Sequence, residues 1–233
     1  MKNKTIIVGG DSWASGEWVD HQLTHGGLTE YLIDHGYRVI NLSCPGGSNS
    51  QAVSAIHNFL KFNPKIEILT VILFQTEWSR TEIIATDINS GYLNLKNKVI
   101  SRFYYDCTTL NTIFNIPIQI VGGCSDTIWI DYFSNEYPGV SIVCQSFTNL
   151  ILNNDHRISH PIYSCLNYVP LVEKLKAQID HRDLELLLDD IENGTQRFEL
   201  WKQHEKSYWP DYRHPNRHAH KILFDFLKEQ NIF

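Results

Sequence analysis

The chain has 233 residues, of which 42% are hydrophobic and 20% are charged, so a disordered chain is excluded and a packed core is predicted. This length favours one domain spanning residues 1–233. The formal net charge is -6, and no stripe of Lys and Arg runs along the sequence, which excludes nucleic acid as a main partner.

The N-terminal segment, MKNKTIIVGGDS, contains only four consecutive apolar residues before its glycines. A secretory signal needs roughly 7 to 15 apolar residues and a membrane-spanning helix needs ~20. We therefore expect a cytoplasmic protein with no membrane partner. The five cysteines, at positions 44, 107, 124, 144 and 165, form no C-x-x-C pair. This pattern favours free thiols over disulfides and gives no support for a thiolate metal site.

Segments typical of strands alternate with segments typical of helices along the chain. In order, we predict a strand over residues 5–10, a helix over 27–36, a strand over 37–44, a helix over 48–64, strands over 66–76, 116–123 and 140–147, and a last helix over 218–230. The strand segments are nearly continuously apolar, as expected when helices cover both faces of a sheet. The alternation predicts a three-layer α/β/α sandwich with a central, mostly parallel sheet.

Two longer segments fit this alternation less well. Residues 79–112 are predicted to hold one helix after a polar start. Residues 168–209 are predicted to be helical and strongly charged, with a helix end at Asn193 and Gly194. Either segment is long enough to form a cap over an active site.

The first predicted strand is followed by Asp11 and Ser12 between glycines, in GGDSWASGEW. Three interpretations compete here: a tight turn, a phosphate-binding loop, and a nucleophile at the carboxyl end of a strand, where open parallel sheets bind ligands. The spacing excludes a Walker loop, because five residues separate Gly10 from Gly16 and Glu17 follows. The dinucleotide fingerprint and the G-x-S-x-G elbow are also absent, so the turn and the nucleophile remain.

A nucleophilic serine needs a base within hydrogen-bond reach and an acid that orients this base. Near the other end of the chain, Asp211 and His214 are three residues apart, just before the last predicted helix. Pro210 and Pro215 stiffen this loop, and at this spacing the carboxylate can accept a hydrogen bond from the imidazole. The sequence therefore contains a candidate triad of Ser12, His214 and Asp211.

These motifs resemble those of the GDSL or SGNH hydrolases, in the same order and across almost the whole chain. The GDS motif that ends at Ser12 matches the first block of the family, and the D-x-x-H motif of residues 211–214 matches the last. The resemblance implies a flavodoxin-like sandwich, a Ser-His-Asp triad, and no metal or cofactor. It also implies an oxyanion hole formed by the backbone N–H groups of Ser12 and Gly46, which follows the second predicted strand.

The third block of the family departs from its pattern in this chain. The family motif G-x-N-D supplies an asparagine side chain to the oxyanion hole, but FQTE stands after the corresponding strand, so Thr76 falls at the asparagine position. The hydroxyl of Thr76 or the amide of Gln75 is the expected replacement, and Asn49 lies nearby in sequence order as a candidate for substrate binding. Losing such a donor typically costs about 10²- to 10³-fold in turnover.

Several other residues are candidates for binding or metal ligation. Arg80 can bind a substrate carboxylate or face solvent, and the solvent-facing interpretation is favoured because isolated arginines are common on surfaces. Trp209 and Tyr212 flank the candidate acid and are predicted to line the cleft. His218 and His220 point to different sides of a helix, so we expect surface positions for them and no metal site.

The predicted function is hydrolysis of a carboxylic ester. A short acyl group on a carbohydrate is the first candidate substrate, because no long apolar lid segment is present. Two alternatives stay open: an acyltransferase of the same fold, and a catalytically weak relative that binds a glycan or a small ligand. The sequence does not indicate an oligomeric state.

Overall fold

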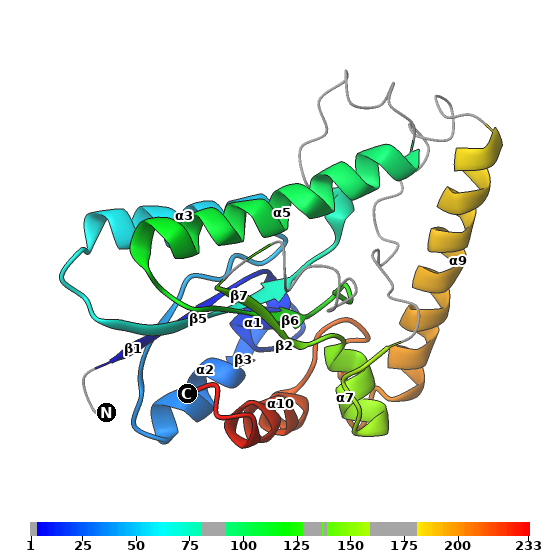
Figure 1. The fold of residues 1–233 in the computed structure, drawn as a ribbon. Coiled ribbons are helices and arrows are strands. Elements are labelled where there is room, and N and C mark those ends of the chain that lie inside the picture. Colours follow the sequence, from blue (N-terminus) through cyan, green and yellow to red (C-terminus); the bar gives the residue numbers. More distant parts are fainter. Residues whose placement is uncertain (1–3, 81–91, 128–136, 138, 159–180) are drawn as a thin grey trace.

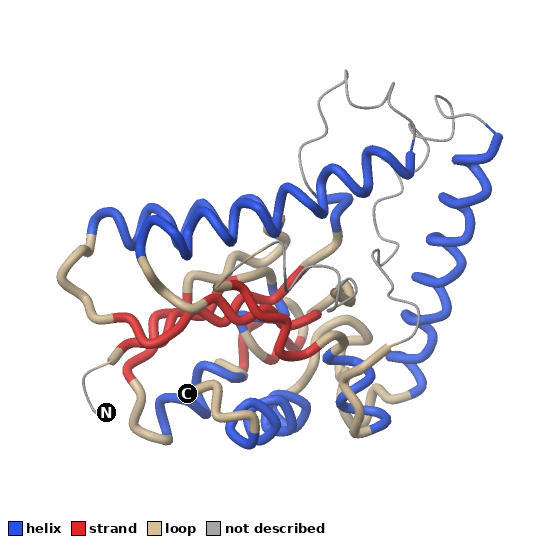
Figure 2. Tube along the Cα trace, viewed as in Figure 1, coloured by secondary structure: helices blue, strands red, loops and turns tan. Residues whose placement is uncertain are grey.

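Five parallel strands form the central sheet of the protein (Figures 1 and 2). The computed structural model describes residues 4–80, 92–127, 137, 139–158 and 181–233. In spatial order the strands are β4 (Arg38–Asn41), β1 (Thr5–Gly9), β5 (Ile68–Gln75), β6 (Ile118–Gly122) and β7 (Val140–Cys144). Every neighbouring pair is parallel, and each of the five predicted strands is confirmed.

Helices cover both faces of this sheet and complete the predicted three-layer sandwich (Figure 1). One face carries α3 (Asn49–Phe62) and α5 (Tyr92–Phe114), and the other carries α2 (Leu28–Asp34), α7 (Phe147–Asn153) and α10 (Arg217–Glu229). The side chains of β1 alternate between the two layers, as the strand period requires. Ile7 belongs to the core beneath α3, whereas Ile6 and Val8 belong to the core beneath α10.

The order of the strands places a binding crevice next to β1. The chain passes from β1 to β4 on one side and later returns to β5 on the other side. Ligands of open parallel sheets bind at such a reversal, beyond the carboxyl ends of the strands. Ser12 follows β1 and Thr76 follows β5, so both residues lie at this crevice.

Side chains cap the starts of α3 and α10. The Ser48 side chain accepts the backbone N–H of Gln51 at 3.2 Å, and the Gln51 side chain accepts the backbone N–H of Ser48 at 2.9 Å, which forms a capping box for α3. Asn216 caps α10 by accepting the backbone N–H of Ala219 at 3.0 Å. Because Asn216 follows His214 by two residues, this cap also fixes the loop that carries the candidate base.

The long helix α9 (His181–Gln203) lies at the side of the sandwich (Figure 1). It continues through Asn193 and Gly194, so the predicted helix end at these residues is wrong. Gly194 is buried on the same face as Arg197 and Trp201. A glycine inside a helix costs about 1 kcal/mol relative to alanine, and the packing of this face outweighs that cost.

The sequence patterns do not predict several short elements, which are α1 (Ser12–Ser15), β2 (Glu17–Val19), β3 (Gln22–His25), the 3₁₀ helix η1 (Trp78–Arg80) and α7. Of the two predicted cap segments, residues 81–91 and 168–180 lie outside the described residues. Cys44, Cys107, Cys124 and Cys144 form no disulfide within the described part of the chain, and Cys165 lies outside it. No helix in the described part of the chain has the length and apolar character needed to cross a bilayer.

Candidate active site

Ser12 begins the short helix α1, directly beyond the carboxyl end of β1. Asp11 caps this helix, because its Oδ1 accepts the backbone N–H of Trp13 at 2.9 Å. Gly10 makes the sharp connection with a φ of 137°, and a Cβ at this position would lie 2.8 Å from the Cβ of Phe74. The turn and the nucleophile are therefore compatible interpretations, since the turn presents Ser12 at the crevice.

His214 and Asp211 lie beside Ser12, from which His214 is 202 positions distant in the sequence. Nε2 of His214 is 2.9 Å from Oγ of Ser12, and Nδ1 is hydrogen-bonded to Oδ2 of Asp211. The other oxygen of Asp211 accepts the backbone N–H groups of Arg213 at 3.0 Å and His214 at 2.7 Å. When Nδ1 donates to the carboxylate, Nε2 carries the lone pair that accepts the serine proton. The structure thus brings all three predicted triad residues together.

These hydrogen bonds keep Asp211 in its charged form. Burial by itself raises the pKa of this carboxyl, but the hydrogen bonds from the ring and backbone of His214 and from the backbone of Arg213 favour the carboxylate more strongly. The pKa of Asp211 is therefore lowered below its ordinary value. An ionised Asp211 can accept all of these hydrogen bonds and stabilise a charged imidazole at His214.

A cavity of about 400 Å³ opens at Ser12. Besides the triad, the residues that line it include Trp18, His21, Gly46, Arg80 and Trp201. A larger cavity of about 690 Å³ is lined by α7 and α9 and contains no triad residue. The smaller cavity is therefore the candidate substrate site.

Two backbone N–H groups next to this cavity are available as donors. Ser12 occupies the first position of α1, where a backbone N–H has no acceptor within the helix. Gly46 follows β4 with a φ of 74°, and no atom lies within 4 Å of the position that its Cβ would take. Neither N–H donates a hydrogen bond to a described residue. Both groups can therefore donate to a bound oxygen atom.

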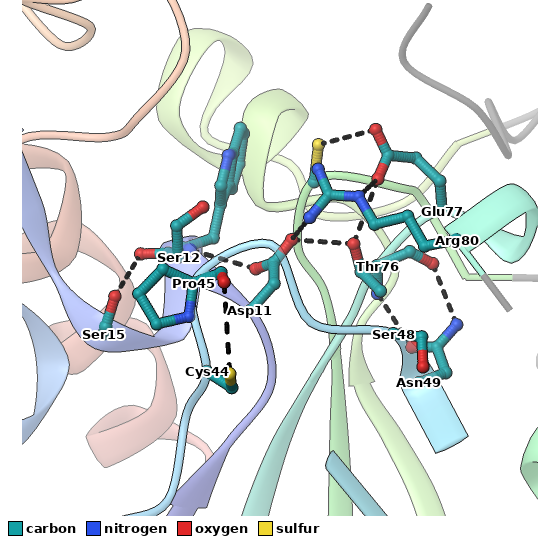
Figure 3. Close-up of polar contacts among 12 residues, drawn as sticks. Asp11, Ser12, Ser15, Cys44, Pro45, Ser48, Asn49, Thr76, Glu77 and Arg80 are labelled. Carbon is teal, nitrogen blue, oxygen red and sulfur yellow. Dashed lines mark hydrogen bonds and ion pairs between the residues drawn. The ribbon is translucent and has the colours of Figure 1, made fainter. Parts of the chain in front are cut away.

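The hydroxyl of Thr76 is directed to carboxylates (Figure 3). It donates to Oδ2 of Asp11 at 2.7 Å, and Oε2 of Glu77 is a second acceptor at 3.1 Å. A hydroxyl has a single proton to donate, and in Thr76 this proton is already donated to a carboxylate within the protein. Thr76 is buried and does not line the cavity, which corrects the prediction that its side chain supplies the third oxyanion donor.

The other two polar side chains predicted at the site, those of Asn49 and Gln75, also form hydrogen bonds within the protein. Asn49 holds the backbone of Thr76, because its Oδ1 accepts the N–H at 2.9 Å and its Nδ2 donates to the carbonyl at 3.0 Å. Gln75 donates from Nε2 to the carbonyl of Asp126 at 2.8 Å and accepts the hydroxyl of Tyr104 at 2.9 Å. Neither Asn49 nor Gln75 lines the cavity. The geometry therefore corrects the predicted binding role of Asn49 and the predicted donor role of Gln75.

Arg80 does not face solvent, contrary to the favoured interpretation of the sequence. Its Nη1 is 3.2 Å from Oδ2 of Asp11, its Nε pairs with Glu77, and its side chain is 20% exposed at the cavity (Figure 3). Burial lowers the pKa of Arg80, but the neighbouring anionic groups raise it above its ordinary value. Burial also raises the pKa of Glu77, and Arg80 offsets part of this effect.

Three buried residues, Asp11, Glu77 and Cys124, each have an atom of a type that ligates metals. These three atoms all lie within 4.8 Å of one another. Arg80 already pairs with both carboxylates, and the Cys124 thiol lies 3.6 Å from Oε1 of Glu77. The guanidinium thus supplies the positive charge that two buried carboxylates require.

Three aromatic residues differ from their predicted positions. Trp209 is fully buried and stacks on Trp201 with ring centroids 6.0 Å apart. Tyr212 is 40% exposed and does not line the cavity. The prediction that Trp209 and Tyr212 line the cleft is therefore wrong. His220 is buried, not exposed, and burial lowers its pKa to about 3. His218 is exposed, as predicted.

Sequence patterns miss the hairpin that carries Trp18 and His21 to the cavity. The turn residues Asp20 and His21 have φ values of 49° and 62°, in the left-handed region that usually selects Asn or Gly. Because no Asn-Gly or Asp-Gly pair marks the turn, the sequence contains no signal that would reveal it.

Comparisons with known proteins were made for the sequence and for the fold. No family model matches this chain. No curated protein sequence matches it. Among solved structures, the chain is similar to a lipase/acylhydrolase from Enterococcus faecalis, with 10% identity, a TM-score of 0.44 and coverage of 98% of this chain and 95% of that chain.

The chain is also similar to the structure of TesA, with 13% identity, a TM-score of 0.44 and coverage of 99% of this chain and 100% of that chain. A third similar structure is AlinE4, described as an SGNH-hydrolase family esterase, with 16% identity, a TM-score of 0.40 and coverage of 75% of this chain and 94% of that chain. At this level of similarity, we base the functional assignment on the geometry around Ser12.

Proposed function

We propose that this protein is a serine hydrolase of the SGNH type that cleaves a carboxylic ester. The observation that supports this most strongly is the continuous path of hydrogen bonds from Ser12 through the ring of His214 to Asp211. A base next to the hydroxyl and an acid behind the base are the groups that activate a serine. They converge from the two ends of the chain at the crevice where ligands of parallel sheets bind.

In the first half-reaction, Oγ of Ser12 forms a bond to the acyl carbon while its proton moves to Nε2 of His214. Asp211 holds the imidazole in the required tautomer and stabilises its charged form. The N–H groups of Ser12 and Gly46 stabilise the negative carbonyl oxygen. The C–O bond of the ester then breaks, and the alcohol leaves with the proton from His214, so that Ser12 carries the acyl group.

In the second half-reaction, water takes the place of the alcohol. His214 accepts a proton from the water molecule while its oxygen bonds to the acyl carbon. The bond to Oγ of Ser12 then breaks, Ser12 regains its proton from His214, and the carboxylic acid leaves. This cycle balances with the triad and water alone.

We infer that the substrate carries a short acyl group, with an acylated carbohydrate as the first candidate. A cavity of about 400 Å³ is at the small end of ligand sites, which favours a short acyl chain. Trp18 lines this cavity and is only partly buried, and the apolar face of such a ring suits packing against a sugar ring.

A fluorophosphonate probe and p-nitrophenyl acetate test this function. The wild-type protein should be labelled and should release p-nitrophenol, whereas Ser12→Ala should do neither and His214→Ala should lose most of both. Ser50→Ala, on the exposed side of α3, should behave as wild type. Wild-type protein that is not labelled, or equal labelling of Ser12→Ala, would falsify the proposal. Acylated product formed from added sugar would instead identify an acyltransferase.

A further inference from the structure

The candidate site shows two oxyanion donors, the backbone N–H groups of Ser12 and Gly46, and the side chains expected as the third donor are all used elsewhere. Thr76 donates to Asp11, Gln75 donates to a backbone carbonyl, and Asn49 donates to the carbonyl of Thr76. We propose that Arg80 supplies the third donor, in place of the asparagine of the third block. This inference rests on the proposed ester hydrolysis.

Arg80 has donors to spare. A guanidinium has five N–H groups. One on Nε points to Glu77 and one on Nη1 points to Asp11, and the remaining three have no acceptor among the described residues. Arg80 lines the same cavity as Ser12 and Gly46, so a substrate bound there is within the cavity that Arg80 borders.

The two carboxylates hold the guanidinium in one orientation. The group is planar and its donors have a fixed geometry, so the contacts to Glu77 and Asp11 also set the direction of the unused N–H groups. Asp11 in addition caps the helix that begins at Ser12. One buried side chain therefore positions both the nucleophile and Arg80 (Figure 3).

The charges around Arg80 favour a role as an oxyanion donor over a role in binding an anionic substrate. Asp11 and Glu77 offset the charge of Arg80, so the cluster attracts a charged substrate group only weakly. The N–H groups remain strong donors toward an oxygen that becomes negative next to Ser12 in the transition state. Arg80 should therefore affect turnover more than substrate binding.

Arg80→Lys tests this role, because it keeps the charge opposite the carboxylates and removes the planar set of donors. We expect kcat for p-nitrophenyl acetate to fall about 10²- to 10³-fold with little change in KM. The inhibition constant of phenylboronic acid, which forms a tetrahedral adduct with an activated serine, should rise in parallel. Arg102→Lys is the matched control, since Arg102 is exposed on α5, pairs with Asp106 and does not line the cavity, so its kcat should stay near the wild-type value.

Two outcomes overturn the inference: a kcat of Arg80→Lys near that of the wild type, or a fall in kcat without weaker boronate inhibition, which indicates a structural role. If the Arg80→Lys variant does not fold, a structure of the wild-type protein with a phosphonate bound to Ser12 decides whether Arg80 is an oxyanion donor. A phosphonyl oxygen within hydrogen-bond distance of Arg80 supports the inference, and contact with the backbone donors alone overturns it. An active wild type with an unaffected Arg80 variant overturns this inference only, whereas an inactive wild type overturns the proposed function as well.

Discussion

At the scale of single residues, Asp11 connects the helix that begins at Ser12 with Thr76 and Arg80. One oxygen accepts the backbone N–H of Trp13 and fixes the start of α1, and the other accepts the hydroxyl of Thr76 and pairs with Arg80. Its side chain is fully buried, where an unpaired carboxylate would be strongly destabilising. The partners of Asp11 thus stabilise its charge and place Ser12 at the same time.

Asp211→Asn tests the orienting role of the triad acid. The amide is unable to stabilise a charged imidazole and can favour the wrong tautomer of His214, so kcat should fall by about 10⁴-fold while KM changes little. Initial rates with p-nitrophenyl acetate at neutral pH measure this. Asp155→Asn is the control, because Asp155 is a half-buried residue of the loop after α7 that does not line the cavity, and its variant should keep the wild-type rate. A loss of less than tenfold in Asp211→Asn would contradict the role.

The predictable part of the site is the part that depends on residue type and order. Ser12, Asp211 and His214 follow from two short motifs, and the structure brings them together. The failed prediction for Thr76 has a different origin. Its hydroxyl has carboxylate acceptors in the fold, and one of them, Asp11, lies 65 positions away in the sequence.

At the scale of elements, the β2–β3 hairpin forms a wall of the cavity that is attached to α10. The Glu17 carboxylate accepts the backbone N–H of Arg217 at 2.6 Å and its side-chain Nη2 at 2.9 Å, and also the hydroxyl of Thr24 at 2.9 Å. Burial by itself raises the pKa of Glu17, but the hydrogen bonds from Arg217 lower it to about 2. The hairpin that carries Trp18 and His21 is therefore linked to the helix that follows His214.

Glu17→Gln should lower the free energy of unfolding at pH 7 by about 1.5 to 3 kcal/mol, the range for hydrogen bonds to a charged group. The folded-state pKa is depressed, so the contribution is complete above the ordinary value of 4.5 and is lost as the pH falls toward about 2. Urea unfolding of wild type and variant across this range measures the difference between them, which should shrink on acidification.

A suitable control is Asp225→Asn, which removes an exposed pair with Lys221 and should change the stability by less than about 0.5 kcal/mol. If the difference between wild type and Glu17→Gln did not depend on pH, the charged form of Glu17 would not be the source of the stability.

At the scale of the whole molecule, the two ends of the chain meet where the strand order reverses. The proposed nucleophile, Ser12, follows β1, and the proposed base, His214, precedes α10, which packs on α2 and α7 on one face of the sheet. On the other side of the cavity, Trp201 of α9 contributes to the lining and packs on Trp13 with ring centroids 5.0 Å apart. The site therefore depends on how α9 is attached to the sandwich.

A buried ion pair makes one of these attachments. Arg197 of α9 lies 2.5 Å from Asp126, in the loop after β6, and both side chains are at most 5% exposed. Asp126→Asn removes the carboxylate charge that lies against the buried guanidinium and should lower the free energy of unfolding by about 3 to 5 kcal/mol. Chemical denaturation measures this loss, and Asp189→Asn, at an exposed position of α9, should unfold like the wild type. A loss below about 1 kcal/mol would show that α9 is not held by this pair.

The sequence by itself determined the five strands, the helices α2, α3 and α10, and the residues of the candidate triad. These features depend on local patterns: apolar runs, capping side chains such as Ser48, and short motifs whose residue types define the chemistry. The tertiary structure decided the β2–β3 hairpin at the cavity, the continuation of α9 through Gly194, and the pairing of Arg80 with Asp11 and Glu77. Each of these depends on contacts between distant segments, such as the pair of Arg80 with Asp11 across 69 positions, and no local pattern encodes such a contact.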